Sequence, residues 1–328
     1  MQFRSEFTPK LFAEKIKITD KLLLVGSCFT EQMGTKLAAH KFDLLQNPNG
    51  ILFNPISIVN AIKSYANNLL FTEADLFYYN ELWASKEHHT MYSGVDKAAT
   101  LAKINESQKV AFNFLQKADW LLITIGSAFV YEWVDVLNDL NYGRVVANCH
   151  KLPANKFNRR LTTAIEIADT LASMQALLIK INPALKIIYT ISPVRHLREG
   201  FVENNQSKAA LIQAVHSQVN ERDIFYFPAY ELVIDDLRDY RFFAEDMVHP
   251  NYTATNYVWQ KFTTTAIDES SQLLMKKISE LNTAINHKPF NPTSKAHIAF
   301  RQKYLQMALE LQSQHPSVNF TADINFFS

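Results

Sequence analysis

Short apolar runs alternate with longer stretches of helical periodicity over the first two thirds of the chain. The runs resemble buried strands, and the longer stretches repeat apolar side chains every three or four residues, as amphipathic helices do. The predicted strands are residues 22–25, 42–46, 120–125, 185–192 and 224–227, and the predicted helices are residues 30–40, a segment from about 55, 98–117, 161–181 and 207–220. Strands alternating with helices indicate βαβ units. The pattern therefore predicts an α/β fold, a three-layer α/β/α sandwich around a mostly parallel sheet.

Two segments depart from this alternation. The aromatic stretch 76–83 and the residues up to 94 suggest an inserted loop or hairpin, and residues 130–136 are expected to pair with 144–147 as a second hairpin. Residues 1–20 suggest an irregular arm.

Beyond residue 256 the composition shifts towards helix alone. Residues 257–287 predict one long or broken helix, the stretch Pro289-Phe290-Asn291-Pro292 ends it, and residues 294–312 predict another. We therefore expect one catalytic-type domain over residues 1–268 and a C-terminal helical appendage over residues 269–328. This appendage would pack on the core or on another subunit, so a homo-oligomer formed through these helices is one expectation.

Composition and charge indicate which kinds of partner and which cellular compartment are expected. The 328 residues are 48% hydrophobic with a formal net charge of +1, so nothing favours nucleic acid or a membrane surface as a partner. Cys28 and Cys149 are too few for a disulfide framework. The first residues lack an apolar signal core, and no apolar run is long enough to span a bilayer. We expect a cytoplasmic protein.

The first strand ends in Gly26-Ser27, directly before a helical pattern. A strand of this kind delivers a serine hydroxyl to a turn at a helix N-terminus, which favours developing negative charge. Ser27 is thus a candidate nucleophile. The alternatives are a turn serine that caps the helix, and Cys28 as a rival nucleophile, although a free cysteine is more often a small buried residue.

A second motif lies far along the chain. Asp246 and His249 stand three apart before Pro250-Asn251 and a further helical pattern, so both can share one loop. The aspartate can then orient an imidazole that acts as general base.

These two motifs together resemble the SGNH (GDSL-like) hydrolase superfamily. Within it the chain closely resembles the GSCFA family, over most of residues 1 to about 268. The motifs that carry this resemblance are Gly26-Ser27-Cys28-Phe29-Thr30, Asn47-Pro48-Asn49-Gly50, Asn148-Cys149-His150-Lys151, Ser192-Pro193-Val194-Arg195-His196 and the Asp246/His249 pair. The resemblance implies an ester hydrolase with Ser27 as nucleophile, His249 as base and Asp246 as its orienting partner.

The resemblance also implies an oxyanion hole made by the Ser27 amide, a glycine amide after the second strand and an asparagine side chain after the third. Gly50 matches the glycine. The asparagine is missing, because Gly126-Ser127 is followed by Ala128, which has no side-chain donor. Loss of one such donor typically costs about 10²–10³ in rate. The candidate replacements are Ser127, Asn49, Asn148 and His150.

Other polar residues leave two interpretations open. Arg195 and His196 follow a predicted strand directly, and they either recognise a carboxylate, phosphate or sugar hydroxyl or lie in a solvated loop. Asn148 and His150 are open in the same way. No metal site is predicted, because the adjacent His88 and His89 lack a third ligand at the usual spacing.

The sequence thus predicts a serine esterase that removes a small acyl group, such as acetyl, from a carbohydrate or similar polar alcohol, without a cofactor. An acyltransferase that uses the same residues, and a binding protein that keeps the fold without activity, are the alternatives.

Overall fold

The core of the protein is a five-stranded parallel sheet, seen here in a computed structural model that describes residues 5–135 and 142–328. The strand order is β2-β1-β5-β8-β9. The strands are β1 (Lys21–Gly26), β2 (Asp43–Gln46), β5 (Trp120–Ile125), β8 (Lys186–Ile191) and β9 (Ile224–Phe227). Numbered within the sheet, this is the flavodoxin-like order 2-1-3-4-5. Its topological switch point lies between β1 and β5, and ligands of such folds bind in the crevice at the carboxyl ends of the strands.

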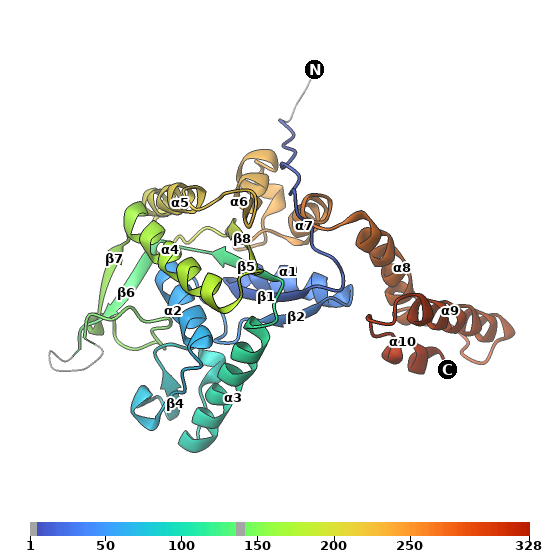
Figure 1. Ribbon diagram of the computed structural model, residues 1–328, viewed down its shortest axis with the longest axis horizontal. Coiled ribbons are helices and arrows are strands. Elements are labelled where there is room, and N and C mark those ends of the chain that lie inside the picture. Colours follow the sequence, from blue (N-terminus) through green and yellow to red (C-terminus); the bar gives the residue numbers. More distant parts are fainter. Residues whose placement is uncertain (1–4, 136–141) are drawn as a thin grey trace.

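Helices cover both faces of this sheet, which makes three layers (Figure 1). Alternate strand residues pack into two separate cores, because successive side chains point to opposite faces. Leu22 and Leu24 join one core with α1 and α7, while Leu23 and Val25 join the other with α2 to α5. The helices are α1 (Cys28–Ala39), α2 (Pro55–Ala66), α3 (Lys97–Leu115), α4 (Ala164–Ile181), α5 (Phe201–His216), the short α6 (Ala229–Glu231) and α7 (Tyr252–Ala266). The predicted α/β sandwich is confirmed.

Two antiparallel hairpins are inserted into this framework. The first, β3 (Leu76–Tyr79) with β4 (Leu82–Ser85), lies in the aromatic stretch where an insertion was predicted. In the second, β6 (Phe129–Trp133) pairs along its whole length with β7 (Phe157–Leu161), while Val145 contributes a single bridge to Glu132. Backbone hydrogen bonds also join β6 to the predicted partner segment, from the Trp133 amide to the Arg144 carbonyl at 2.9 Å and from the Val146 amide to the Tyr131 carbonyl at 2.8 Å. The predicted pairing of 130–136 with 144–147 is therefore confirmed in part, over Tyr131 to Trp133. The longer pairing with β7 was not predicted, and residue 136 lies outside the described residues.

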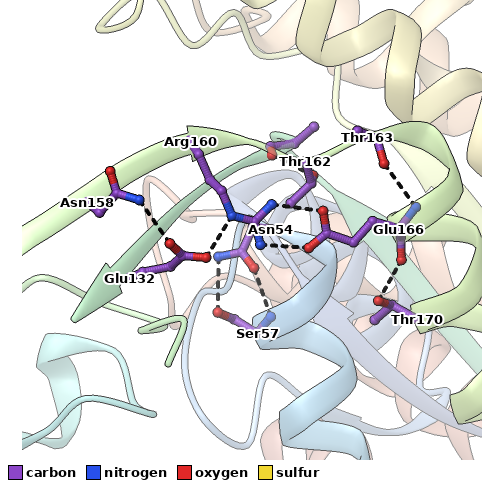
Figure 2. Close-up of polar contacts among 10 residues, drawn as sticks. Asn54, Ser57, Glu132, Asn158, Arg160, Thr162, Thr163, Glu166 and Thr170 are labelled. Atoms are coloured by element: carbon purple, nitrogen blue, oxygen red, sulfur yellow. Dashed lines mark hydrogen bonds and ion pairs between the residues drawn. The ribbon is translucent and has the colours of Figure 1, made fainter. Parts of the chain in front are cut away.

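Charged side chains fix the second hairpin to the body of the protein. Figure 2 shows Arg160 of β7 between two carboxylates: its Nε donates to Glu132 at 2.6 Å, and its terminal nitrogens donate to Glu166 of α4 at 2.7 and 2.8 Å. Three of the five residues of β7 are polar, so the strand has little apolar alternation, which explains why the hydrophobic pattern missed it.

The C-terminal segment is helical, as predicted, and extends to one side of the sheet (Figure 1). Its helices are α8 (Glu269–Ile285), α9 (Lys295–Gln314) and α10 (Thr321–Phe327), and the last was not predicted. They contact the end of α1, where the buried carboxylate of Asp323 pairs with Lys41 at 2.5 Å and Asn282 donates to the Ala39 carbonyl at 2.8 Å. The boundary at residue 268 and an oligomer formed through these helices stay predictions. Among the described residues, no helix combines the length and the apolar character that crossing a bilayer requires.

Candidate active site

Ser27 stands at the carboxyl end of β1 and is the N-cap residue of α1. Its side chain does not cap that helix, although the side chains of residues at the same position do so at α2, α3, α4, α7, α8 and α9. The Ser27 Oγ is buried and has no hydrogen-bond partner among the described residues. Because buried hydroxyls are nearly always hydrogen-bonded, the capping interpretation does not account for this serine.

Asp246 and His249 form a hydrogen-bonded pair, as the sequence spacing suggested. His249 Nδ1 lies 2.5 Å from Asp246 Oδ2, and Asp246 Oδ1 accepts the backbone N–H groups of Val248 and His249 at 3.0 Å each. These bonds lower the pKa of Asp246 to about 2, with the His249 amide as the largest cause. The carboxylate is therefore charged at neutral pH and orients the imidazole. No hydrogen bond within the described part of the chain joins Ser27 Oγ to His249. Such bonds often tighten only when substrate binds.

His196 lies between this pair and the sheet. Its Nε2 is buried without a partner among the residues described, and it approaches Gly126, where an added Cβ would lie 3.0 Å from it. Its ring packs edge-on against Phe53, with 5.5 Å between ring centroids. Burial is the main cause that lowers the pKa of His196 to about 4, followed by the charges of Lys208 and His249. His196 is therefore a neutral imidazole at neutral pH.

Arg195, the residue before His196, contacts the loop that carries Asp246 and His249. Its guanidinium lies over the rings of Phe243 and Tyr240, 4.8 and 5.6 Å from their centroids, and its amide donates to the Val248 carbonyl at 3.3 Å. Arg195 thus connects the loop after β8 to the loop that carries Asp246 and His249.

The predicted oxyanion donors are occupied by other acceptors. The Ser27 amide donates to the Thr124 carbonyl at 3.1 Å, and the Gly50 amide donates to the Asn47 carbonyl at 2.7 Å. Ala128 is buried, and its amide donates to Ser207 Oγ at 2.8 Å. The oxyanion hole expected from the resemblance is therefore not open in this conformation.

The four candidate replacements also have structural roles. Asn49 donates to the Glu87 carbonyl and accepts from Tyr65 Oη, and Ser127 Oγ accepts the Phe129 amide. Asn148 Oδ1 accepts the His150 amide at 2.7 Å, and His150 Nε2 lies 2.8 Å from the Ser85 carbonyl oxygen.

Asn47 was not predicted as a donor. Its side-chain NH₂ group, unlike the side chains of the four candidates above, is available to donate. Asn47 follows β2 directly, and its Oδ1 accepts the Gly26 amide at 2.9 Å, beside the Ser27 turn. Its Nδ2 is buried and has no partner among the described residues. The backbone φ of +45° favours asparagine at this position. The available signal was its place immediately after the second predicted strand.

The histidine-rich segment after β4 borders the site. The His89 amide donates to the Asn49 carbonyl at 2.8 Å, and the His89 side chain covers Gly50, where an added Cβ would come within 2.3 Å of the His89 Cβ. His88 is fully buried, with Nδ1 3.0 Å from Ser85 Oγ. No three His, Cys, Asp or Glu side chains in residues 5–135 and 142–328 are grouped as a metal site would require.

Asn49 also borders a cavity of about 640 Å³. Polar and charged groups line it, among them Asn49, Asn60, Lys86, Glu87 and Arg144. Burial raises the pKa of Glu87 to about 7, so this carboxyl is partly protonated at neutral pH. Apolar side chains, among them Leu70, Phe71 and Phe77, complete the lining, so the cavity presents both polar and apolar surface.

The GSCFA family matches residues 21–262, and the C-terminal domain of GSCFA domain proteins matches residues 278–328. The first match covers the α/β domain, whose switch point lies at the Gly26-Ser27 turn, and the second covers the C-terminal helices. The protein belongs to the GSCFA family.

Solved structures similar to the chain include three esterases. An acetyl esterase, crystallised as a serine-to-alanine mutant with acetate ion, is 12% identical, with 80% of this chain and 99% of that one covered and a TM-score of 0.36. A carbohydrate esterase family 3 protein from Talaromyces cellulolyticus is 12% identical, with 80% and 99% covered and a TM-score of 0.34. An acetyl xylan esterase from the rumen bacterium Butyrivibrio proteoclasticus is 11% identical, with 83% and 66% covered and a TM-score of 0.36. A search of curated proteins finds none that matches.

Proposed function

We propose that the protein is a serine esterase of the SGNH type, with Ser27 as nucleophile, His249 as general base and Asp246 as the residue that orients His249. One observation carries the proposal. Three buried polar atoms without partners among the described residues, on Ser27, Asn47 and His196, follow the ends of three of the sheet strands, next to the switch point between β1 and β5. Leaving such atoms unpaired costs free energy, and a polar substrate would satisfy them.

The reaction proceeds through an acyl-enzyme. Ser27 Oγ attacks the ester carbonyl carbon and gives its proton to His249 Nε2, while Asp246 stabilises the imidazolium. The C–O bond to the alcohol then breaks, and the leaving alkoxide takes the proton from His249. In the second half, water attacks the acyl carbon and loses a proton to His249. The bond between the acyl carbon and Ser27 Oγ then breaks, His249 returns the proton to Ser27 Oγ, and the acid leaves. No cofactor enters these steps.

Asn47 Nδ2 supplies an oxyanion donor in place of the asparagine that is missing at Ala128. Its Oδ1 is held by the Gly26 amide, so the amide orientation is fixed and Nδ2 is the free end. Donors aimed at the oxyanion are often the largest single contribution to acyl-transfer catalysis.

The substrate class proposed is a small acyl ester, such as an acetyl ester, of a carbohydrate or similar polar alcohol. Ser27 and His196 Nε2 are buried, which leaves little room for a long acyl chain. Because Ser27 is fully buried, substrate entry requires the side chains that cover it to move.

Labelling with a fluorophosphonate probe tests the nucleophile directly. We expect wild type to be labelled, Ser27→Ala and His249→Ala not to be labelled, and all three to give the same far-UV circular dichroism spectrum. Cys28→Ala is the matched control, because burial raises the pKa of this thiol and keeps it protonated. Retained labelling of Cys28→Ala supports Ser27. Labelling that persists in Ser27→Ala, or its absence from folded wild type, contradicts the proposal.

A further inference from the structure

Lys208 is a lysine in the hydrophobic interior. It lies in the middle of α5, on the buried stripe that also includes Asn204, Leu211 and Val215, and its side chain is 1% exposed. Lysine is almost never fully buried unless it is paired, because removing an ammonium from water is costly. A charge in this position therefore requires an explanation that packing alone does not give.

The Lys208 ammonium is held by two main-chain carbonyls. Its Nζ donates to the carbonyl oxygens of Gly126 and Ser192, each at 2.7 Å. These residues come directly after β5 and β8, which are neighbours in the sheet. Among the described residues no carboxylate pairs with Lys208, so the two carbonyl dipoles are its counterpart. One side chain thus connects the ends of two central strands where both enter the candidate site.

The same ammonium lies close to the groups of that site. Gly126 is the residue that His196 Nε2 approaches, and Ser192 begins the turn that leads to Arg195 and His196. The charge of Lys208 acts on the Cys28 thiol, next to Ser27, and on the His196 imidazole. Lys208 is therefore a buried amine whose charge reaches Cys28, the residue after Ser27, and His196.

We propose that Lys208 is a positioning residue of the Ser27 site: its ammonium holds the carboxyl ends of β5 and β8 together and supplies a buried positive charge that stabilises the oxyanion formed at Ser27. This inference rests on the esterase function proposed above. Ala128 cannot donate a side-chain hydrogen bond to the oxyanion. In this proposal the Asn47 amide and the Lys208 charge together supply the missing stabilisation. Preorganised charges act strongly in such water-excluded sites because no solvent screens them.

The proposal makes the activity sensitive to pH on the alkaline side. Burial lowers the pKa of Lys208 to about 7, and the groups that face it are Cys28 on α1, His196 after β8 and Tyr230 on α6, whose ring centroid lies 5.7 Å from Nζ. As the pH rises through the pKa of Lys208, the ammonium is lost and kcat falls.

The test compares kcat and KM for p-nitrophenyl acetate across pH in wild type, Lys208→Met and Lys208→Gln, with the exposed Lys180→Met as matched control. We expect Lys208→Met to lose about 10²-fold in kcat, as for removal of one oxyanion-stabilising group. KM should change little, and the alkaline limb should disappear. Lys208→Gln keeps two donors for the carbonyls but no charge, so it should fold if the methionine variant does not, and it should lack the alkaline limb too. An unchanged kcat, or an alkaline limb retained in either folded variant, overturns the proposal.

Hydrogen exchange separates this proposal from the esterase function. If folded wild type neither hydrolyses the ester nor binds the fluorophosphonate, the esterase function fails, and with it the charge assigned to the oxyanion. Exchange of the Ser127, Phe129 and Val194 amides then decides the remaining part. These amides should exchange faster in Lys208→Met or Lys208→Gln than in Lys180→Met if Lys208 holds the strand ends. Equal exchange rates show that it does not.

Discussion

The imidazole of His249 and the carboxylate of Asp246 lie 2.5 Å apart on one loop, and the same carboxylate accepts two backbone amides of that loop. Oδ2 therefore faces the imidazole while Oδ1 holds the main chain, so each oxygen has its own role. The arrangement leaves Nε2 of His249 as the ring nitrogen available to a nucleophile.

Replacing Asp246 by asparagine separates these roles. Asp246→Asn keeps Oδ1 as an acceptor for the amides but presents an NH₂ group to Nδ1, which favours the wrong tautomer of His249. We expect kcat for p-nitrophenyl acetate to fall by up to about 10⁴, as for the corresponding change in a serine–histidine–aspartate triad, with little change in thermal unfolding. Glu245→Gln removes one negative charge from the neighbouring exposed residue and serves as the control. Equal activity of the two variants would show that Asp246 has no special role.

Asn47→Asp tests the donor proposed for the oxyanion. Aspartate tolerates the positive φ of this position and keeps the oxygen that accepts the Gly26 amide, but it has no N–H to donate. We expect kcat to fall by about 10²–10³, with a smaller change in KM. Asn205→Asp, on the exposed face of α5, is the matched control for the added charge. If Asn47→Asp retains wild-type kcat, the donor must be sought elsewhere.

Two glycines at the start of the chain's first βα unit should respond differently to alanine. Gly26 has φ of +148°, and an added Cβ would lie 2.2 Å from the Thr124 carbonyl oxygen in the neighbouring strand. Backbone strain of this kind costs about 1–3 kcal/mol, and the clash with main chain adds to it. Gly26→Ala should therefore lower the melting temperature clearly.

Gly34→Ala is the comparison. Its Cβ would meet the end of the Gln46 side chain, which can turn away, and alanine in a helix interior gains about 0.5–1 kcal/mol over glycine. We expect a melting temperature close to that of wild type, measured by circular dichroism. A similar loss in both variants would contradict the assignment of strain to Gly26.

The fold was predictable from the sequence because its sheet strands are buried on both faces. Leu22 to Val25 alternate between two cores, so nearly every residue is apolar and the run is conspicuous. Elements rich in polar residues were missed because they lack a continuous or periodic apolar pattern. Three of the five residues of the strand Phe157–Leu161 are polar, and the first turns of α5, predicted from residue 207 but starting at Phe201, include a buried asparagine, Asn204.

The sequence predicted site residues only where two residues that act together lie close to each other in the chain. Asp246 and His249 share one loop, so their pairing could be inferred from three residues of separation. Asn47 and Lys208 reach the site through hydrogen bonds to the main chain of other strands, and no local pattern indicates such contacts. Lys208 left one trace, a charged residue at an apolar position of a helical stripe.

The acid sensitivity of folding should depend on His88. Its ring is 1% exposed, packs against Phe71 and Tyr92, and has its pKa lowered to about 3, first by burial and then by His150. The unfolded chain takes up this proton near pH 6.5, whereas the folded protein does not until about pH 3. The unfolded state thus binds more protons in this window, and the free energy of unfolding falls as the pH falls, by up to about 1.4 kcal/mol per pH unit.

His88→Gln removes that titration while its amide can still hydrogen-bond Ser85. In urea unfolding between about pH 7 and about pH 4, within the window that linkage defines, we expect the slope of unfolding free energy against pH to decrease by up to one proton relative to wild type. Wild type and variant share two further contributions in this window: His196, whose pKa is also lowered, to about 4, and, with the opposite sign, Glu87, whose pKa is raised to about 7. His287→Gln, at an exposed position in the segment between α8 and α9, should keep the wild-type slope. Because slopes are compared rather than absolute stabilities, a general destabilisation by His88→Gln does not affect the result, and an unchanged slope would show that His88 is not the group that titrates.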